Sequence, residues 1–89
     1  MSSSPSIEDR IIAAYSELAY EPGGWVMLTR LRDVILGVER ADVDAALLAL
    51  YRDDRISLIA EVNQRALSYD NRIDAVSVGG DVKHLFRVR

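Results

Sequence analysis

Apolar residues near the start of the chain recur with the spacing of an α-helix. They fall three or four residues apart and form one continuous stripe: Ile7, Ile11, Ala14, Tyr15 and Leu18. Ser6 stands where a side chain can cap the helix, with Asp9 three residues later, as in a capping box. The pattern predicts an amphipathic helix that begins after Ser6 and is ended by Pro22, Gly23 and Gly24.

A second, shorter helix is predicted after the glycine pair. Trp25 and Val26 favour a short extended segment, and Thr29 is a suitable N-cap for the helix that follows it. The apolar residues expected on the buried face of this helix are Leu31, Val34 and Ile35. Gly37 stands where a helix would end in the left-handed conformation.

The third helix has a strong amphipathic pattern. Its apolar residues are again spaced by three and four: Val43, Ala46, Leu47 and Leu50. We expect this helix to begin near Glu39 or Arg40 and to end at about Tyr51, because Asp53 and Asp54 follow it.

Two segments in the last third of the chain have the composition of β-strands. Residues 56–60 are rich in branched apolar side chains. Residues 83–89 alternate, which places His84, Phe86 and Val88 on one face and Lys83, Leu85, Arg87 and Arg89 on the other. We therefore expect a β-ribbon formed by these two segments.

The connection between the two predicted strands is long. It begins with a polar loop, residues 62–65, and continues into a short helix that Ser68 can cap. We expect this helix to pass through Ile73 and to end at Ala75 or Val76. Gly79 and Gly80, followed by Asp81, supply the turn into the last strand.

Composition indicates one small α+β domain. The chain has 89 residues, of which 49% are hydrophobic and 28% charged, values ordinary for a globular domain. It has no cysteine, so disulfides and thiolate metal sites are excluded. We expect a disordered tail at residues 1–5 and one domain at residues 6–89.

The order of the predicted elements resembles that of winged helix-turn-helix domains over about residues 7–88. The likeness is carried by Trp25 and Val26 before the second helix, Thr29, Gly37, the apolar stripe of the third helix and the two strands. It implies a three-helix core with a two- or three-stranded antiparallel wing, here with a short extra helix between the wing strands. Aligning Gly37 with the turn glycine of repressors puts Arg32 at a core position, so the likeness is to the broad class.

That resemblance implies a binding function. Most members of the class bind duplex DNA as transcription regulators, with the third helix in the major groove and the wing along the backbone. A minority use the same surfaces to bind proteins or RNA, and fold alone does not decide between these functions.

The outward face of the third helix is unusual for contact with DNA. It carries Ala41, Ala45, Leu48 and Arg52, with Asp42 and Asp44 nearby. Carboxylates repel phosphates, and alanine offers no hydrogen bond to a base edge. These residues fit an ordinary exposed face, and they also fit a strip, formed by Ala41, Ala45 and Leu48, for a homodimer or a protein partner.

Basic residues gather in the C-terminal part of the chain. The net charge is −3, yet residues 62–89 contain five basic and three acidic residues, giving +2. The candidate DNA-binding residues are Arg52, Arg65, Arg72, Lys83 and Arg87. The alternative is a solvated strand face whose charges discourage unwanted strand pairing.

No motif of catalysis or cofactor binding is present in the sequence. His84 is the only histidine, and its alternation with Phe86 predicts a buried or half-buried structural residue. One histidine without cysteine does not assemble a typical zinc site. We expect a non-enzymatic cytoplasmic domain with no cofactor, metal or membrane contact.

Overall fold

The structure, a computed structural model, describes residues 6–89, apart from the side chain of Gln64. The tail expected at residues 1–5 lies outside the described residues. Helices and antiparallel sheets are combined in an α+β fold, which confirms the predicted class at that level.

Helix α1 (Ile7–Leu18) begins as its sequence predicts. The Ser6 hydroxyl oxygen accepts a hydrogen bond from the backbone N–H of Asp9 at 3.1 Å, and two acidic residues lie in the first turn. The buried residues Ile11, Ala14 and Tyr15 belong to the expected stripe. The helix ends at Leu18, before the proline and glycines that the sequence suggested as its end.

Helix α2 (Leu28–Val34) departs from its prediction at both ends. Met27 is the N-cap and makes no side-chain capping bond, so the expected capping role of Thr29 is wrong. The Thr29 hydroxyl instead accepts a hydrogen bond from Asn71 Nδ2 at 3.0 Å. Val34, expected on the buried face, is exposed, because the short helix turns only Leu28 and Leu31 inward.

Helix α3 (Arg40–Arg52) has the predicted bounds and the predicted buried stripe. The side chains that enter the core are those of Val43, Ala46, Leu47 and Leu50. Gly37, in the connection from α2, has a φ of +76° and so adopts the expected left-handed conformation.

The main sheet has three antiparallel strands in the order β1-β5-β2. Their bounds are β1 (Val26–Met27), β2 (Ile56–Ile59) and β5 (Leu85–Val88). Strand β5 pairs with both neighbours, with Phe86 opposite Val26 and Arg87 opposite Ser57. Phe86 is fully buried, so this central strand closes the core beneath the helices.

Residues 60–84, which we call the insert, connect β2 to β5. They form the 3₁₀ turn η1 (Gln64–Ala66), helix α4 (Tyr69–Ile73) and the hairpin of β3 (Val76–Val78) and β4 (Asp81–Lys83). The capping box of Ser68 and Asn71 confirms the predicted start of the short helix, but the helix ends at Ile73 and not at Ala75 or Val76, because β3 begins at Val76. The hairpin was missed: the sequence predicted one last strand from Lys83, whereas the chain forms β4 and β5 on either side of His84.

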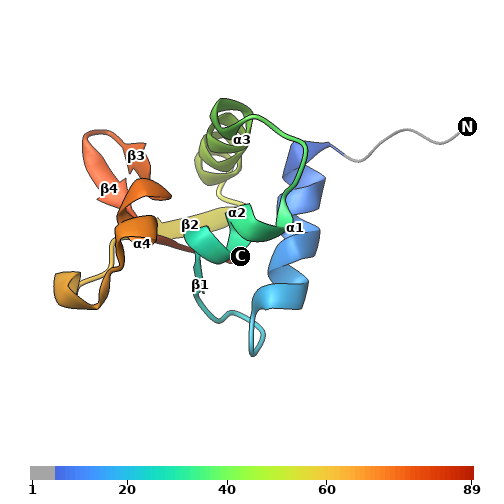
Figure 1. Ribbon diagram of the computed structural model, residues 1–89. Helices are drawn as coiled ribbons and strands as arrows, with labels where there is room; N and C mark the ends of the chain where they lie inside the picture. The colour runs from blue at the N-terminus through green and yellow to red at the C-terminus, as the bar shows by residue number, and fades with distance from the viewer. Residues whose placement is uncertain (1–5) are drawn as a thin grey trace, which may run out of the picture.

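The insert is joined to the core. Leu67 and Val76 are buried, and Val76 belongs to the same apolar cluster as the helices. In the view of Figure 1 the insert lies at the opposite side of the molecule from α1, with α2 and α3 between them. Within residues 6–89, no helix combines the length and the apolar character needed to cross a membrane.

Candidate functional site

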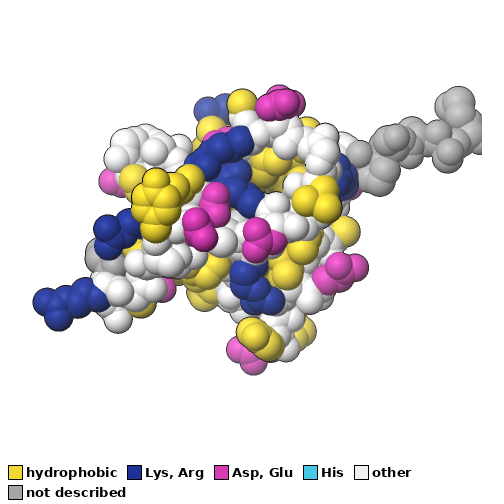
Figure 2. All heavy atoms as spheres, viewed as in Figure 1, with side chains coloured by type: hydrophobic (Ala, Val, Ile, Leu, Met, Phe, Trp, Pro, Cys, Tyr) yellow, Lys and Arg dark blue, Asp and Glu magenta, His cyan; other side chains and the backbone are white. Residues whose placement is uncertain are grey.

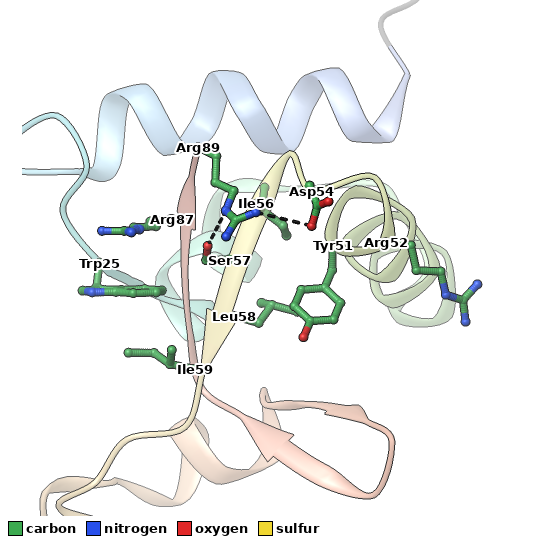
Figure 3. A pocket seen from close by; sticks show the side chains of 10 residues that line it. All are labelled: Trp25, Tyr51, Arg52, Asp54, Ile56, Ser57, Leu58, Ile59, Arg87 and Arg89. Carbon is green, nitrogen blue, oxygen red and sulfur yellow. Dashed lines mark hydrogen bonds and ion pairs between the residues drawn. The ribbon is translucent and has the colours of Figure 1, made fainter.

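An open groove runs along strand β2, between the outer face of the sheet and the C-terminal end of helix α3. It has a volume of about 550 Å³ and is lined by Trp25, Tyr51, Arg52, Asp54, Ile56, Ser57, Leu58, Ile59, Arg87 and Arg89 (Figure 3). We call it the sheet groove. Side chains alternate along a strand, so while Phe86 enters the core, its neighbour Arg87 faces the groove.

Arg87 and Trp25 form one rim of the sheet groove. The guanidinium carbon of Arg87 lies 4.9 Å from the centre of the Trp25 ring, a distance that permits a cation–π interaction. Figure 3 shows the two side chains side by side, with Ile59 on the other side of the ring. The contact holds the guanidinium in place while Arg87 stays exposed.

Arg89 directly follows β5 and contacts Asp54, in the turn between α3 and β2. Its Nη1 is 3.3 Å from Asp54 Oδ1, and its Nε donates a hydrogen bond to Ser57 Oγ at 3.0 Å. Both members of this ion pair are largely exposed, so water screens it and its contribution to stability is small.

Arg52, the last residue of α3, forms the opposite rim. Its side chain is exposed and points away from the sheet in Figure 3. Within residues 6–89 it makes no ion pair or side-chain hydrogen bond, which leaves its five N–H donors to solvent. Counting three arginines against Asp54 gives the sheet groove a formal charge of +2, in a chain whose net charge is −3.

The structure separates the five predicted DNA-binding residues into two groups. Arg52 and Arg87 line the sheet groove together. Arg65 lies in η1, Arg72 in α4 and Lys83 in β4, so all three belong to the insert and none lines the groove.

Arg89, Trp25 and Tyr51 are among the groove residues that the sequence analysis did not select as binding residues. The spacing of two between Arg87 and Arg89 was a usable signal, because it puts both side chains on one strand face. No sequence pattern indicated that Trp25 and Tyr51 line the same groove, since Trp25 directly precedes β1 and Tyr51 lies in α3.

Four charged residues, Arg32, Arg40, Asp44 and Asp74, join α2 and α3 to the insert, and we call them the clamp. Arg32 Nη2 donates to Asp44 Oδ1 at 2.5 Å, and Arg32 Nε donates to the backbone oxygen of Asp74 at 2.9 Å. The Arg32 side chain is only 12% exposed, so its charge is compensated where it is poorly hydrated.

Arg40 extends the clamp from the first turn of α3. Its Nη2 donates to the backbone oxygens of Ile73 and Ala75, and its Nη1 lies 3.7 Å from Asp74 Oδ1. Figure 2 shows basic and acidic side chains gathered on the face formed by α2, α3 and the insert. Arg40 and Asp44, near the N-terminal end of α3, thus bind other residues of the molecule.

The apolar strip predicted on α3 is only partly exposed. Ala41 and Ala45 are exposed, as expected for an outer face. Leu48 is half-buried and packs against the core cluster, so only part of its side chain is exposed on the outer face. The helix is rotated so that this side chain reaches the edge of the core.

His84 has the structural environment that its alternation predicted. The side chain is buried, and its Nδ1 accepts a hydrogen bond from the backbone N–H of Glu61 at 3.1 Å. Among residues 6–89, no three histidine, cysteine, aspartate or glutamate side chains are grouped closely enough to hold a metal ion.

Comparisons of the chain with models of protein families, with curated proteins and with solved structures give no match.

Proposed function

We propose that this chain is a winged-helix DNA-binding domain that contacts the phosphate backbone through the sheet groove. The order of helices and the β1-β5-β2 sheet fit that architecture. The observation that carries the proposal is that Arg52, Arg87 and Arg89 line one groove of formal charge +2 in an acidic chain.

The arginines suit phosphate contact in three different ways. Arg87 is pre-oriented by Trp25, so little side-chain entropy is lost on binding. Arg52 lies exposed at the rim, and Arg89 can exchange its screened carboxylate partner for a phosphate. A guanidinium matches the geometry of a phosphate with two parallel hydrogen bonds.

The clamp favours contact through the groove over insertion of α3 into a major groove. Arg40 and Asp44 are held by Asp74 and Arg32, so the first turns of α3 have few free polar groups for base edges. Phosphate contacts carry little sequence information. We therefore expect binding that tolerates many DNA sequences.

A protein-interaction function through α3 is the weaker proposal. Ala41 and Ala45 are exposed on α3, but Leu48, the largest side chain of that strip, is partly buried against the core. What remains is small compared with the roughly 800 Å² that each partner contributes to a standard interface.

The test is the binding of a labelled random-sequence forked DNA, which has both duplex and single-stranded arms, between about 50 and 200 mM salt. The double variant Arg52→Gln, Arg87→Gln should bind at least about tenfold more weakly. It should also reduce the slope of log affinity against log salt by about 1.4 to 1.8, the value for two lost phosphate contacts.

Arg30→Gln is the matched control for Arg87→Gln. Arg30 also lies over an aromatic ring, at 5.4 Å from the centre of Tyr20, but it does not line the sheet groove. We expect its affinity to be unchanged. Equal losses in both single variants, or a larger loss in Arg65→Gln with Arg72→Gln, would place the interface elsewhere.

A further inference from the structure

We propose that the sheet groove binds a single strand of nucleic acid in preference to a duplex, with a base stacked at the Trp25–Arg87 rim. This inference rests on the proposed function and specifies its ligand. It follows from the apolar surface that lies among the three arginines.

The groove exposes aromatic and aliphatic side chains beside its charges. Trp25 is 38% exposed, Tyr51 36% and Ile59 37%. A duplex offers such side chains only sugars and phosphates unless they enter a groove, because its base faces are stacked inside. An unpaired strand exposes its base faces, and stacking on aromatic side chains is a general means of holding it.

The arrangement of Trp25 and Arg87 gives a base a planar group to stack on. The Trp25 ring lies between Arg87 and Ile59 in Figure 3, and the guanidinium is exposed beyond the ring. A base placed on the guanidinium would continue the stack while its phosphate reaches the neighbouring arginines. Arginine serves in this way because it is planar as well as charged.

The dimensions of the groove also favour one strand. Its volume of about 550 Å³ is in the range of pockets that hold small organic molecules, roughly 300–1,000 Å³. That space suits one or two nucleotides. Arg89 and Ser57 lie between the two rims, so polar groups continue across the groove from Trp25 to Arg52.

Helix α3, the element that would bind a duplex in its major groove, already uses polar side chains of its first turns in the clamp. A helix entering a major groove presents its N-terminal residues to the bases. In α3 those residues include Arg40 and Asp44, both members of the clamp. The sheet groove is therefore open to bases, whereas Arg40 and Asp44 of α3 are already paired within the molecule.

An acidic peptide is the competing ligand, because it matches the charge of the groove without base faces. The difference is measurable, since Trp25 is the only tryptophan of the chain and its fluorescence reports directly on the groove. The ligands to compare are a mixed-sequence single-stranded oligonucleotide, the same oligonucleotide annealed to its complement, and polyglutamate.

We expect the single strand to quench Trp25 fluorescence and to bind at least about tenfold more tightly than the duplex, at equal nucleotide concentration. Trp25→Leu should lower the affinity for the single strand roughly 5- to 150-fold, the range for loss of one stacked base. Tyr20→Leu is the matched control, because it removes an exposed ring that Arg30 covers away from the groove.

Arg87→Lys keeps the charge but removes the planar group, and it makes the test independent of whether Trp25→Leu folds. It should weaken single-strand binding and leave the weaker duplex binding nearly unchanged. Equal affinity for both DNA forms, unaffected by either variant, would overturn the single-strand inference and leave the proposed function standing.

Two other outcomes are decisive. If polyglutamate binds as tightly as the single strand, with the same quenching, the groove recognises negative charge alone. Its ligand would then be an acidic protein, and the single-strand inference would be overturned. If neither DNA form binds at low salt, the proposed function fails, and the inference fails with it.

Discussion

Gly79 and Gly80 form the tip of the β3–β4 hairpin, and each has a positive φ, +58° and +90°. A two-residue turn with both φ values positive matches the right-handed twist of the strands it joins. The sequence correctly placed a turn here but assigned it to the start of the last strand. Val76–Val78, with only three residues, is too short to give a strand signal of its own.

Gly80→Ala should lower the free energy of unfolding by about 1 to 2 kcal/mol, because an alanine side chain disfavours the left-handed region. Denaturant titration followed by circular dichroism measures the change. Ser77→Ala, at an exposed position of the neighbouring strand, should alter stability little. Equal stability of Gly80→Ala and the wild type would show that the turn adopts another conformation in solution.

The ion-pair partners of Arg32 could not be predicted from residue types alone. Its charge at a position expected to be apolar looked like a misfit to the winged-helix pattern. The structure accounts for it, because Asp44 and Asp74 meet its guanidinium from 12 and 42 residues away along the chain. Pairing over such distances has no periodic signal in a sequence.

At the scale of elements, strong periodicity gave reliable predictions. The stripes of α1 and α3 and the alternation in residues 83–89 all match the observed buried faces, with His84 and Phe86 inward. The failures are at Thr29 and Val34, where α2 is too short for a stripe to define its register. Thr29 was predicted to be a cap because threonine suits that position. Its actual partner, Asn71, lies in the insert, 42 residues away along the chain, and a local pattern cannot indicate such a bond.

Asp44→Asn should weaken the attachment of the insert to α2 and α3. Its carboxylate is 30% exposed and pairs with a largely buried guanidinium, so we expect a loss of about 1 to 3 kcal/mol after discounting for solvent. Hydrogen exchange should become faster in α4 and the β3–β4 hairpin than in α1.

Asp42→Asn is the control for that substitution. Asp42 lies two residues earlier on the same helix, is exposed and makes no ion pair among the described residues. Its replacement should change stability by less than about 0.5 kcal/mol. Uniformly faster exchange in Asp44→Asn, in α1 as much as in α4, would argue that the clamp supports the whole domain and not the insert.

At the scale of the whole molecule, the sequence predicted part of the groove and could not assemble the rest. Charge counting pointed to the C-terminal part of the chain and the outward face of the third helix added Arg52; of the five candidates, Arg52 and Arg87 line the groove. Arg65, Arg72 and Lys83 do not, because they belong to the insert, which packs beside α2. The groove depends on three-dimensional proximity between Trp25, the end of α3, strand β2 and the C-terminal strand β5.

We expect the domain to be monomeric at micromolar concentration, because the exposed part of the α3 strip consists of two alanines. Light scattering should give a mass near 9.9 kDa, and Ala45→Glu should not alter it. Leu48→Glu is the wrong probe of this surface, since a charge at a half-buried position would destabilise the fold itself. A dimeric mass abolished by Ala45→Glu would favour the partner function of α3.

The central position of β5 determines when this domain can fold during its synthesis. Strands β1 and β2 do not pair with each other, so each lacks a strand partner until residues 85–88 have emerged from the ribosome. Phe86, which completes the core, arrives at the same moment. Until then the nascent chain displays the apolar faces of α1 and α3, and a product that stops before β5 is a substrate for chaperones and proteases.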